Sequence, residues 1–98
     1  MPFKPFTDYL LLEKNYSALT VKAYQNDIKT FLGFIEKEYE TSSINYVNYS
    51  QIRSWIVSLV ESELSNRSIN RKISALNTYY KFLLKVGGIE SNPLSKHK

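Results

Sequence analysis

Residues 65–86, SNRSINRKISALNTYYKFLLKV, carry an apolar repeat at helical spacing together with a run of basic residues. At about 100° per residue, the apolar positions fall on one side of a helix: Ile69, Ile73, Leu76, Tyr80 and Leu83, with Tyr79, Phe82 and Val86 widening that side near its end. Ser65 can cap the N-terminus, and Gly87-Gly88 can end the helix because glycine adopts the left-handed conformation without strain. The stretch therefore predicts a long amphipathic helix with one buried side.

The opposite side of this predicted helix is rich in cations and amides and contains no Asp or Glu. Its members are Arg67, Asn70, Arg71, Ser74, Asn77, Thr78, Lys81 and Lys85, with Lys72 at the border. A solvated face usually mixes both signs, because opposite charges at i,i+4 stabilise a helix and like charges repel. Arg and Lys neutralise phosphates, Asn reads adenine, and a helix N-terminus adds partial positive charge. The strip therefore favours nucleic-acid binding; a solvated face with a chance excess of cations is the alternative.

Three further helical segments are predicted, and no segment indicates a strand. The first runs from Pro5 to about Lys14, and the second is capped by Ser17 and ends near Glu38. The apolar side of the second holds Leu19, Tyr24, Ile28, Phe31, Leu32 and Ile35. Ser50 is expected to cap the third, whose buried stripe is Ile52, Trp55, Ile56, Leu59 and Val60, and the loop before it is expected to pack through Ile44, Tyr46 and Val47. These segments predict an all-α fold, a compact four-helix bundle.

A second, weaker polar strip lies near the start of the helix after Ser17. It consists of Ser17, Thr20, Lys22, Gln25, Asn26 and Lys29, with only Asp27 opposing the positive charge. Alone, this strip is typical of ordinary surface, but two such strips on one small bundle strengthen the case for a DNA-facing surface. The hypothesis requires that Arg67, Arg71 and Lys81 share one side and that neighbouring carboxylates do not neutralise them.

Composition excludes several classes of protein. The 98 residues are 43% hydrophobic and 14% aromatic, enough for one domain with a core, and the net charge of +4 is only mildly basic. The chain has no Cys and a single His, His97, so neither a disulfide nor a multi-histidine metal site is possible, and no cofactor is indicated. No apolar run approaches the roughly 20 residues that span a bilayer, and no signal peptide is recognisable. We therefore expect a cytoplasmic protein without membrane or small-molecule partners.

No catalytic site is visible in these residues. Carboxylate pairs could be drawn from Glu36, Glu38 and Glu40, or from Glu61 and Glu63, but each is more simply an exposed helix-end charge. Tyr24, Tyr79 and Tyr80 occupy core-like positions, so packing is their default role. Trp55 is expected at the centre of the core.

The order of these features resembles the N-terminal core-binding domain of tyrosine recombinases, the phage-integrase and Xer family. A pattern S-x-x-T-x-x-x-Y-x-x-D-[IL] is matched by Ser17, Thr20, Tyr24, Asp27 and Ile28. A later pattern is matched by Ser65, Ser68, Ile69, Arg71, Lys72, Ile73, Ser74, Ala75 and Leu76, and the closing features by Tyr79, Tyr80, Phe82, Leu83, Asn92, Pro93 and Leu94. The resemblance covers nearly the whole chain, although Asn77 stands where relatives often carry Arg.

The resemblance implies a SAM-like four-helix domain that forms one half of a clamp on DNA, with its second and fourth helices facing a recombination half-site. Residue by residue, it implicates Ser17, Thr20, Lys22, Arg67, Ser68, Arg71, Lys72 and Asn77. The exposed strips add further candidate contacts, namely Lys29, Asn66, Asn70, Ser74 and Lys81. We expect residues 1–91 to be the core-binding domain and residues 92–98 to begin a linker to a catalytic domain that this sequence lacks, so that the fragment binds DNA but is no enzyme. The parent would be a recombinase that breaks and rejoins DNA.

Two expectations follow for partners and variants. Neutralising about five phosphates predicts a log–log slope of DNA affinity against salt of roughly −4 to −5. Arg71→Glu combined with Lys72→Glu is expected to abolish DNA binding without unfolding, since both side chains are predicted to lie outside the core.

The alternative function is a helical protein-interaction module that pairs with an acidic partner or with itself. Exposed Phe3, Tyr46 or Tyr49 would support that alternative, and the first helix is the expected contact with other recombinase subunits.

Overall fold

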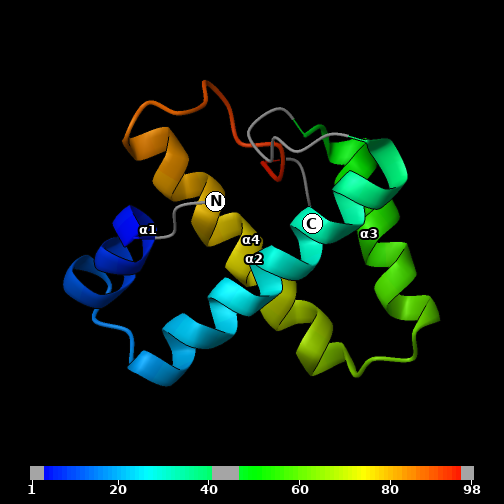
Figure 1. The fold of residues 1–98 in the computed structure, drawn as a ribbon, viewed down its shortest axis with the longest axis horizontal. Coiled ribbons are helices and arrows are strands. Elements are labelled where there is room, and N and C mark those ends of the chain that lie inside the picture. Colours follow the sequence, from blue (N-terminus) through cyan, green and yellow to red (C-terminus); the bar gives the residue numbers. More distant parts are fainter. Residues whose placement is uncertain (1–3, 41–46, 96–98) are drawn as a thin grey trace.

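The structure, a computed structural model, describes residues 4–40 and 47–95 and contains helices but no strand within those ranges (Figure 1). A short helix α1 (Lys4–Asp8) continues into a π-helical segment η1 (Tyr9–Glu13). The three longer helices are α2 (Ala18–Tyr39), α3 (Tyr49–Glu61) and α4 (Asn66–Lys85). The predicted all-α bundle is confirmed. None of the described helices is long and apolar enough to cross a membrane.

The expected caps of α2 and α4 are present. Ser17 and Ser65 accept hydrogen bonds through their hydroxyl oxygens from the backbone N–H groups of Thr20 and Ser68, both at 3.2 Å. At the other end of α4, Gly87 has a φ of 78°, and the N–H of Gly88 donates to the carbonyl of Leu83 at 2.8 Å. This 6→1 hydrogen bond closes the helix as a Schellman motif, which needs a residue that tolerates positive φ.

The start of α3 differs from the predicted one. Ser50 was expected as the cap, but Asn48 caps the helix and Ser50 lies inside it. Asn48 Oδ1 accepts from the Gln51 N–H, and Gln51 Oε1 accepts from the Asn48 N–H, both at 3.0 Å. This reciprocal capping box satisfies two backbone donors at once, whereas a serine at position 50 would satisfy one.

The first helical segment has the predicted extent but two geometries. After Asp8 the turns widen into η1, and the N–H of Lys14 donates to the Tyr9 carbonyl at 3.1 Å. Asn15 then adopts a φ of 56°, a left-handed conformation that asparagine tolerates better than most residues, and the chain turns into α2. Lys85 near the end of α4 pairs with Glu13 and lies over the Tyr9 ring, which ties η1 to α4.

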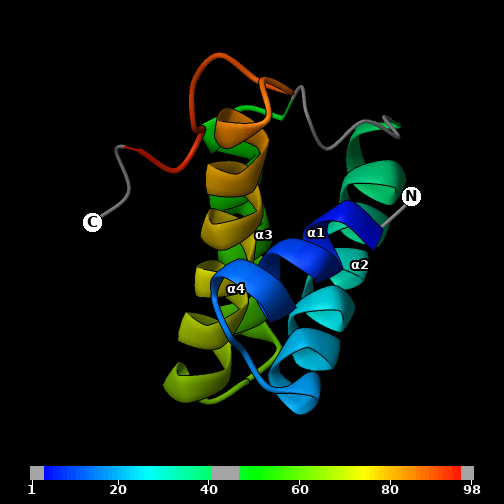
Figure 2. The same ribbon diagram turned by 90° about the vertical axis from the view of Figure 1, so that its left-hand side faces the viewer.

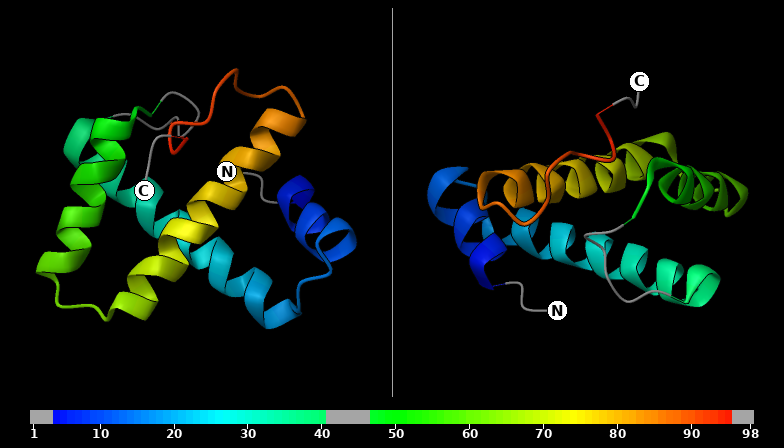
Figure 3. Two further views of the ribbon diagram at one scale, coloured as in Figure 1. Left: turned by 180° about the vertical axis from the view of Figure 1, so that it is seen from behind. Right: turned by 90° about the horizontal axis from the view of Figure 1, so that it is seen from above.

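The helices are arranged around the crossing of α2 and α4. Helices α1 and η1 flank this pair on one side and α3 flanks it on the other (Figures 1 and 3). Trp55, 1% exposed, packs edge-on against Phe31 at a ring-centroid distance of 4.8 Å, and Tyr80 is fully buried. Trp55 is therefore at the centre of the core, as expected.

Three residues expected on apolar sides are exposed instead: Leu19 at 82%, Val60 at 59% and Val86 at 59%. Leu19 lies roughly 180° around α2 from the buried Ile28 at about 100° per residue, so it belongs to the outer face. Val60 falls at the edge of the α3 stripe in the last turn, and Val86 follows the end of α4. These positions are corrections to the predicted core.

The segment after α4 folds back onto the bundle as far as it is described. Asn92 Nδ2 donates to Asn77 Oδ1 at 2.9 Å, and Asn92 Oδ1 accepts from the Leu94 N–H at 2.8 Å. Leu94 is 5% exposed and joins the core, as does Val47 at 6%. The proposed domain boundary at residue 91 stays a prediction, and Phe3, Ile44, Tyr46 and His97 lie outside the described residues.

Replacing Trp55 by alanine should lower the free energy of unfolding by about 3–5 kcal/mol, because loss of the indole would leave a large cavity beside Phe31. Denaturant unfolding followed by circular dichroism measures this change. Val60→Ala in the same helix is the control and should stay within about 0.5 kcal/mol, as expected for an exposed site. Equal losses for the two variants would contradict the core assignment.

Candidate nucleic-acid interface

Helices α2 and α4 begin at the same edge of the molecule. Both N-termini lie at the bottom in Figure 1 and remain there after the quarter turn of Figure 2, so the views agree. Each helix starts with the same arrangement, a capping serine whose hydroxyl also donates to the hydroxyl three residues later, Ser17 to Thr20 at 3.0 Å and Ser65 to Ser68 at 3.1 Å. Two positive helix ends therefore lie toward the same edge, apart from each other, and at each of them first-turn N–H groups lack helical acceptors.

A buried carboxylate joins the two helices behind this edge. Asp27 of α2 is 1% exposed and accepts three hydrogen bonds from α4. Arg71 donates to both of its oxygens, through Nε to Oδ2 at 3.0 Å and through Nη2 to Oδ1 at 2.9 Å. Lys72 Nζ donates to Oδ1 at 2.8 Å. A buried charge needs this degree of pairing, because an unpaired carboxylate in the core would be strongly unfavourable.

The Asp27 cluster retains one net positive charge, from two cations on one carboxylate. Hydrogen bonding to Asp27 and its charge raise the pKa of Arg71, so this guanidinium stays protonated. Burial, followed by the neighbouring Tyr16 and Asp27, raises the pKa of Tyr24, which therefore stays neutral beside the pair. The Arg71 side chain is 47% exposed, whereas that of Lys72 is 14% exposed. The net positive charge of the cluster therefore reaches the molecular surface chiefly through Arg71.

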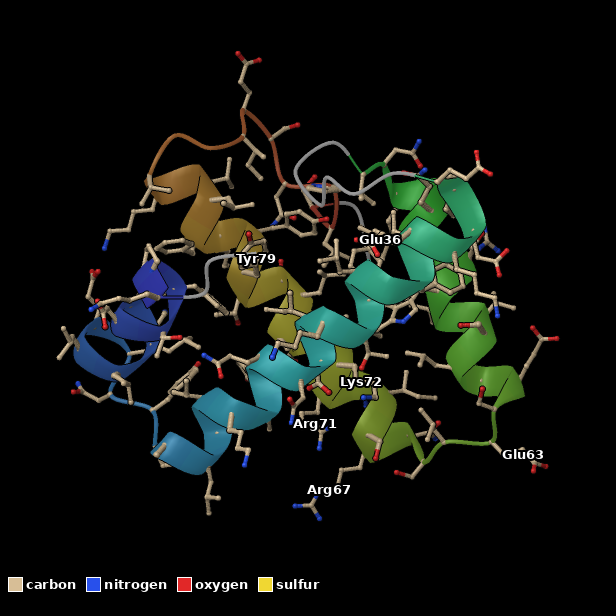
Figure 4. The ribbon with its side chains drawn as sticks, viewed as in Figure 1. Glu36, Glu63, Arg67, Arg71, Lys72 and Tyr79 are labelled. Atoms are coloured by element: carbon tan, nitrogen blue, oxygen red, sulfur yellow. The ribbon has the colours of Figure 1, made fainter. Side chains whose placement is uncertain are left out.

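Several predicted site residues lie near the starts of these two helices. Figure 4 shows Arg67 and Arg71 projecting from α4 toward the edge at which both helices begin. Arg67 is exposed and makes no ion pair with any described carboxylate. We call this surface the N-terminal edge and define it by Ser17, Thr20, Lys22, Asn66, Arg67, Ser68 and Arg71.

Other predicted residues lie elsewhere, because the two polar strips face apart. Lys29 lies about 160° around α2 from Asp27, on the side away from α4. Ser74 and Lys81 lie about 160–180° around α4 from Lys72, on the side away from α2, and Asn70 borders them. All four are exposed. The strips therefore do not form one continuous surface.

Two predicted side chains are withdrawn from the surface. Lys72 was expected at the border and outside the core, but its ammonium group is engaged with the buried Asp27. Asn77 is half-buried and accepts from Asn92. Among the described residues, the condition that carboxylates leave the strip unpaired holds for Arg67 and Lys81, which share the outer side of α4, and fails for Arg71. Reversing the charges of Arg71 and Lys72 is therefore no longer expected to spare the fold.

Asp27 is the residue that sequence reasoning misread. It was taken as a charge opposing the surface cations, whereas it is the buried partner of two of them. Its position supplied a signal, since it falls on the flank of the apolar side of α2 rather than on the outer face. A lone acid on a flank, together with an Arg-Lys pair on another helix, is the pattern that could have indicated the pairing.

The glutamates and tyrosines considered in the sequence as candidate catalytic groups occupy exposed and core positions, respectively. The five glutamates considered in the sequence are all exposed, and Glu36 and Glu63 lie on separate parts of the molecule (Figure 4). Over the ranges 4–40 and 47–95, no group of three or more acidic, His or Cys side chains gathers that could hold a metal ion. Burial raises the pKa values of Tyr79 and Tyr80, which are core residues without the exposure that a nucleophile needs.

Comparison with known proteins gives a consistent set of similarities. Residues 3–87 match the family described as phage integrase, N-terminal SAM-like domain. The chain is 47% identical over 88 residues to the tyrosine recombinase XerC of Oceanobacillus iheyensis, covering 90% of this chain and 28% of that protein. It is 40% identical over 90 residues to XerC of Anoxybacillus flavithermus and 42% identical over 94 residues to XerC of Leptospira interrogans, covering 92% and 95% of this chain and 30% of each relative. No solved structure shows significant similarity.

Replacing both Arg71 and Lys72 by glutamate should destabilise the fold by at least about 3–5 kcal/mol, the loss expected when a buried pair is broken. Two new carboxylates would then face Asp27, so the helix crossing would open. Thermal unfolding by circular dichroism measures the loss.

The matched control is Arg67→Glu combined with Lys81→Glu, which changes net charge equally at exposed sites without ion pairs. It should stay within about 1 kcal/mol, because exposed substitutions each shift stability little. Equal stability of the two double variants would contradict the buried pair.

Proposed function

Because the chain belongs to the phage integrase N-terminal SAM-like domain family, we propose that it is the DNA-binding module of a site-specific tyrosine recombinase. The module would grip a recombination half-site with the starts of α2 and α4. The match spans less than a third of each XerC relative, so the recombination activity, its DNA substrate and its partners are proposals for the whole protein. Strand breakage and rejoining would belong to a different part of that protein.

One observation carries the proposal: the N-termini of α2 and α4 lie toward the same edge of the molecule, and basic side chains lie near both of them. Arg67 and Lys22 have no ion-pair partner among the described residues, and Arg71 keeps part of its guanidinium exposed. Phosphates are recognised by this combination of basic side chains, hydroxyls and first-turn N–H groups. A protein partner with an acidic surface could use the same charges, but it would not require two helix N-termini toward the same edge of the molecule.

The roles of the edge residues follow from their chemistry. Lys22, Arg67 and Arg71 would neutralise phosphates, and Thr20 and Ser68 would donate hydroxyl hydrogen bonds to the backbone or to base edges. The Ser17 hydroxyl already donates to Thr20, so Ser17 would act by capping α2. Asn66 has an amide group of the kind that pairs with adenine in the major groove, and Asn70, which lies outside the edge, would do so only if the DNA follows the α4 surface. Lys29, Ser74 and Lys81 face away from the edge. The two lysines would contribute through long-range attraction, and Ser74 would contribute only if the DNA follows the α4 surface.

A second candidate function, contact between subunits, is supported by the first helical segment. Leu12 is 76% exposed and Leu11 39% exposed on η1, while Phe6 and Leu10 anchor the same segment in the core. An exposed apolar surface on a segment that is anchored in the core suits a protein partner. We propose that α1 and η1 contact another recombinase subunit on DNA, which adds to DNA binding rather than replacing it.

The 98-residue chain should bind a short mixed-sequence DNA duplex in the micromolar range or weaker at low salt, as non-specific binding does. Fluorescence anisotropy between about 50 and 200 mM salt should give a log–log slope near −3 if Lys22, Arg67 and Arg71 alone meet phosphates. A slope near −4.5 would add Lys29 and Lys81 to the contact surface. Absent binding or a flat salt response would contradict the proposal.

Arg67→Glu should weaken this binding by about tenfold or more and reduce the slope by about 1, since one phosphate contact is lost. Arg53→Glu is the matched control, because Arg53 is an exposed arginine on α3 and the change in net charge is the same. The control should differ from the unmodified chain by less than about threefold, the effect of net charge at a distance. Equal effects of the two substitutions would remove the N-terminal edge as the DNA surface.

A further inference from the structure

The guanidinium group of Arg71 is held from one side only. An arginine side chain has five N–H donors, and Asp27 takes one from Nε and one from Nη2. Both donors of Nη1 and the second donor of Nη2 are left over, on the side of the guanidinium away from the carboxylate. Because the side chain is 47% exposed, these donors reach the surface at the N-terminal edge.

The pairing with Asp27 also fixes where those donors point. A bidentate contact to two carboxylate oxygens defines both the position and the plane of a guanidinium, whereas a single contact leaves it free to swing. Asp27 is 1% exposed and is itself held by Lys72, so it cannot move with Arg71. The outer edge of Arg71 is therefore set in place before any ligand arrives.

Asp27 could be neutralised without the bidentate contact from Arg71. Lys72 already places an ammonium group 2.8 Å from Oδ1 and is nearly withdrawn from solvent, which suits a structural counter-ion. Arg71 adds a second positive charge, half-exposed, at the edge where both helices begin. Lys72 thus neutralises the buried carboxylate, whereas Arg71 contacts this carboxylate and also reaches the surface.

We propose that Asp27 is a positioning residue for DNA binding, which holds the Arg71 guanidinium so that its outer edge meets a DNA phosphate. This inference rests on the proposed function. The arginine would then bridge two anions, the buried carboxylate and the phosphate, using different donors for each. Affinity is gained because a long side chain that is already ordered loses little freedom when the phosphate binds.

For the variant Asp27→Asn, the proposed positioning role and the change in net charge predict opposite effects on DNA affinity. Asp27→Asn raises the net charge by one, which by simple electrostatics should tighten DNA binding. If Asp27 positions Arg71, the same substitution should weaken binding by about three- to tenfold, the factor for ordering one long side chain on binding. The salt slope should also fall by about 0.9 as one phosphate contact is lost.

Lys72→Met is the matched control in the same buried cluster. It removes a positive charge but leaves the two Arg71 contacts to Asp27, so binding should change by less than about threefold and the slope should stay. Circular dichroism confirms that each variant is folded. The ¹⁵Nε–¹H signal of Arg71 reports the pairing directly and should shift in Asp27→Asn but persist in Lys72→Met.

If Asp27→Asn does not fold, Arg71→Lys tests the same point, because lysine keeps the charge but cannot bridge two anions with a planar fork. It should weaken DNA binding by about three- to tenfold. Unchanged or tighter binding in Asp27→Asn, or in Arg71→Lys if that variant is needed, would overturn the positioning role. Failure of the unmodified chain to bind DNA would instead refute the proposed function, so the two failures are distinguishable.

Discussion

The ion pair of Asp27 with Arg71 and Lys72 is the constraint on which the placement of α2 and α4 depends. Apolar contacts between helices are non-directional and tolerate sliding, whereas a buried carboxylate with two fixed donors accepts only one register. Ala75, fully buried one turn after Arg71, adds a small side chain where the helices approach. Once that register is set, the two helix N-termini must lie at one edge. The candidate interface is thus a consequence of a core contact.

Sequence patterns predicted each helix because periodicity and capping are local properties. Ser17, Ser65 and Gly87 act as expected, since their effects depend on neighbours within a few residues. Apart from local errors at the cap of α3 and at the exposed Leu19, Val60 and Val86, the failures concern relations between helices. A helical wheel places Arg71 and Lys72 relative to their own axis, but it says nothing about a carboxylate on α2, 44 and 45 residues earlier. For the same reason the wheel could not show that the polar strips face apart.

The arrangement of the strips changes how such a domain would read DNA. A continuous face of two helices could lie flat along a duplex, but an edge of two helix ends meets it with few side chains. Lys29 and Lys81, on opposite outer faces, then add to the electrostatic field, which acts over about 10 Å at moderate salt, rather than to direct contacts. Such a surface favours register and orientation over extensive base readout. Full sequence specificity would require further contacts from elsewhere in a longer recombinase.

The buried charge also bears on why the core is not wholly apolar. Hydrophobic residues of similar volume often stabilise a fold as well as a buried ion pair does, so stability alone is a weak explanation for Asp27. An apolar side chain at that position could hold α2 against α4, but it could not hold the plane of a guanidinium. Position 71 faces the N-terminal edge, and an arginine there without a fixed partner would sample many rotamers. The carboxylate therefore links two requirements, the register of the helices and the orientation of a surface cation, in one set of hydrogen bonds.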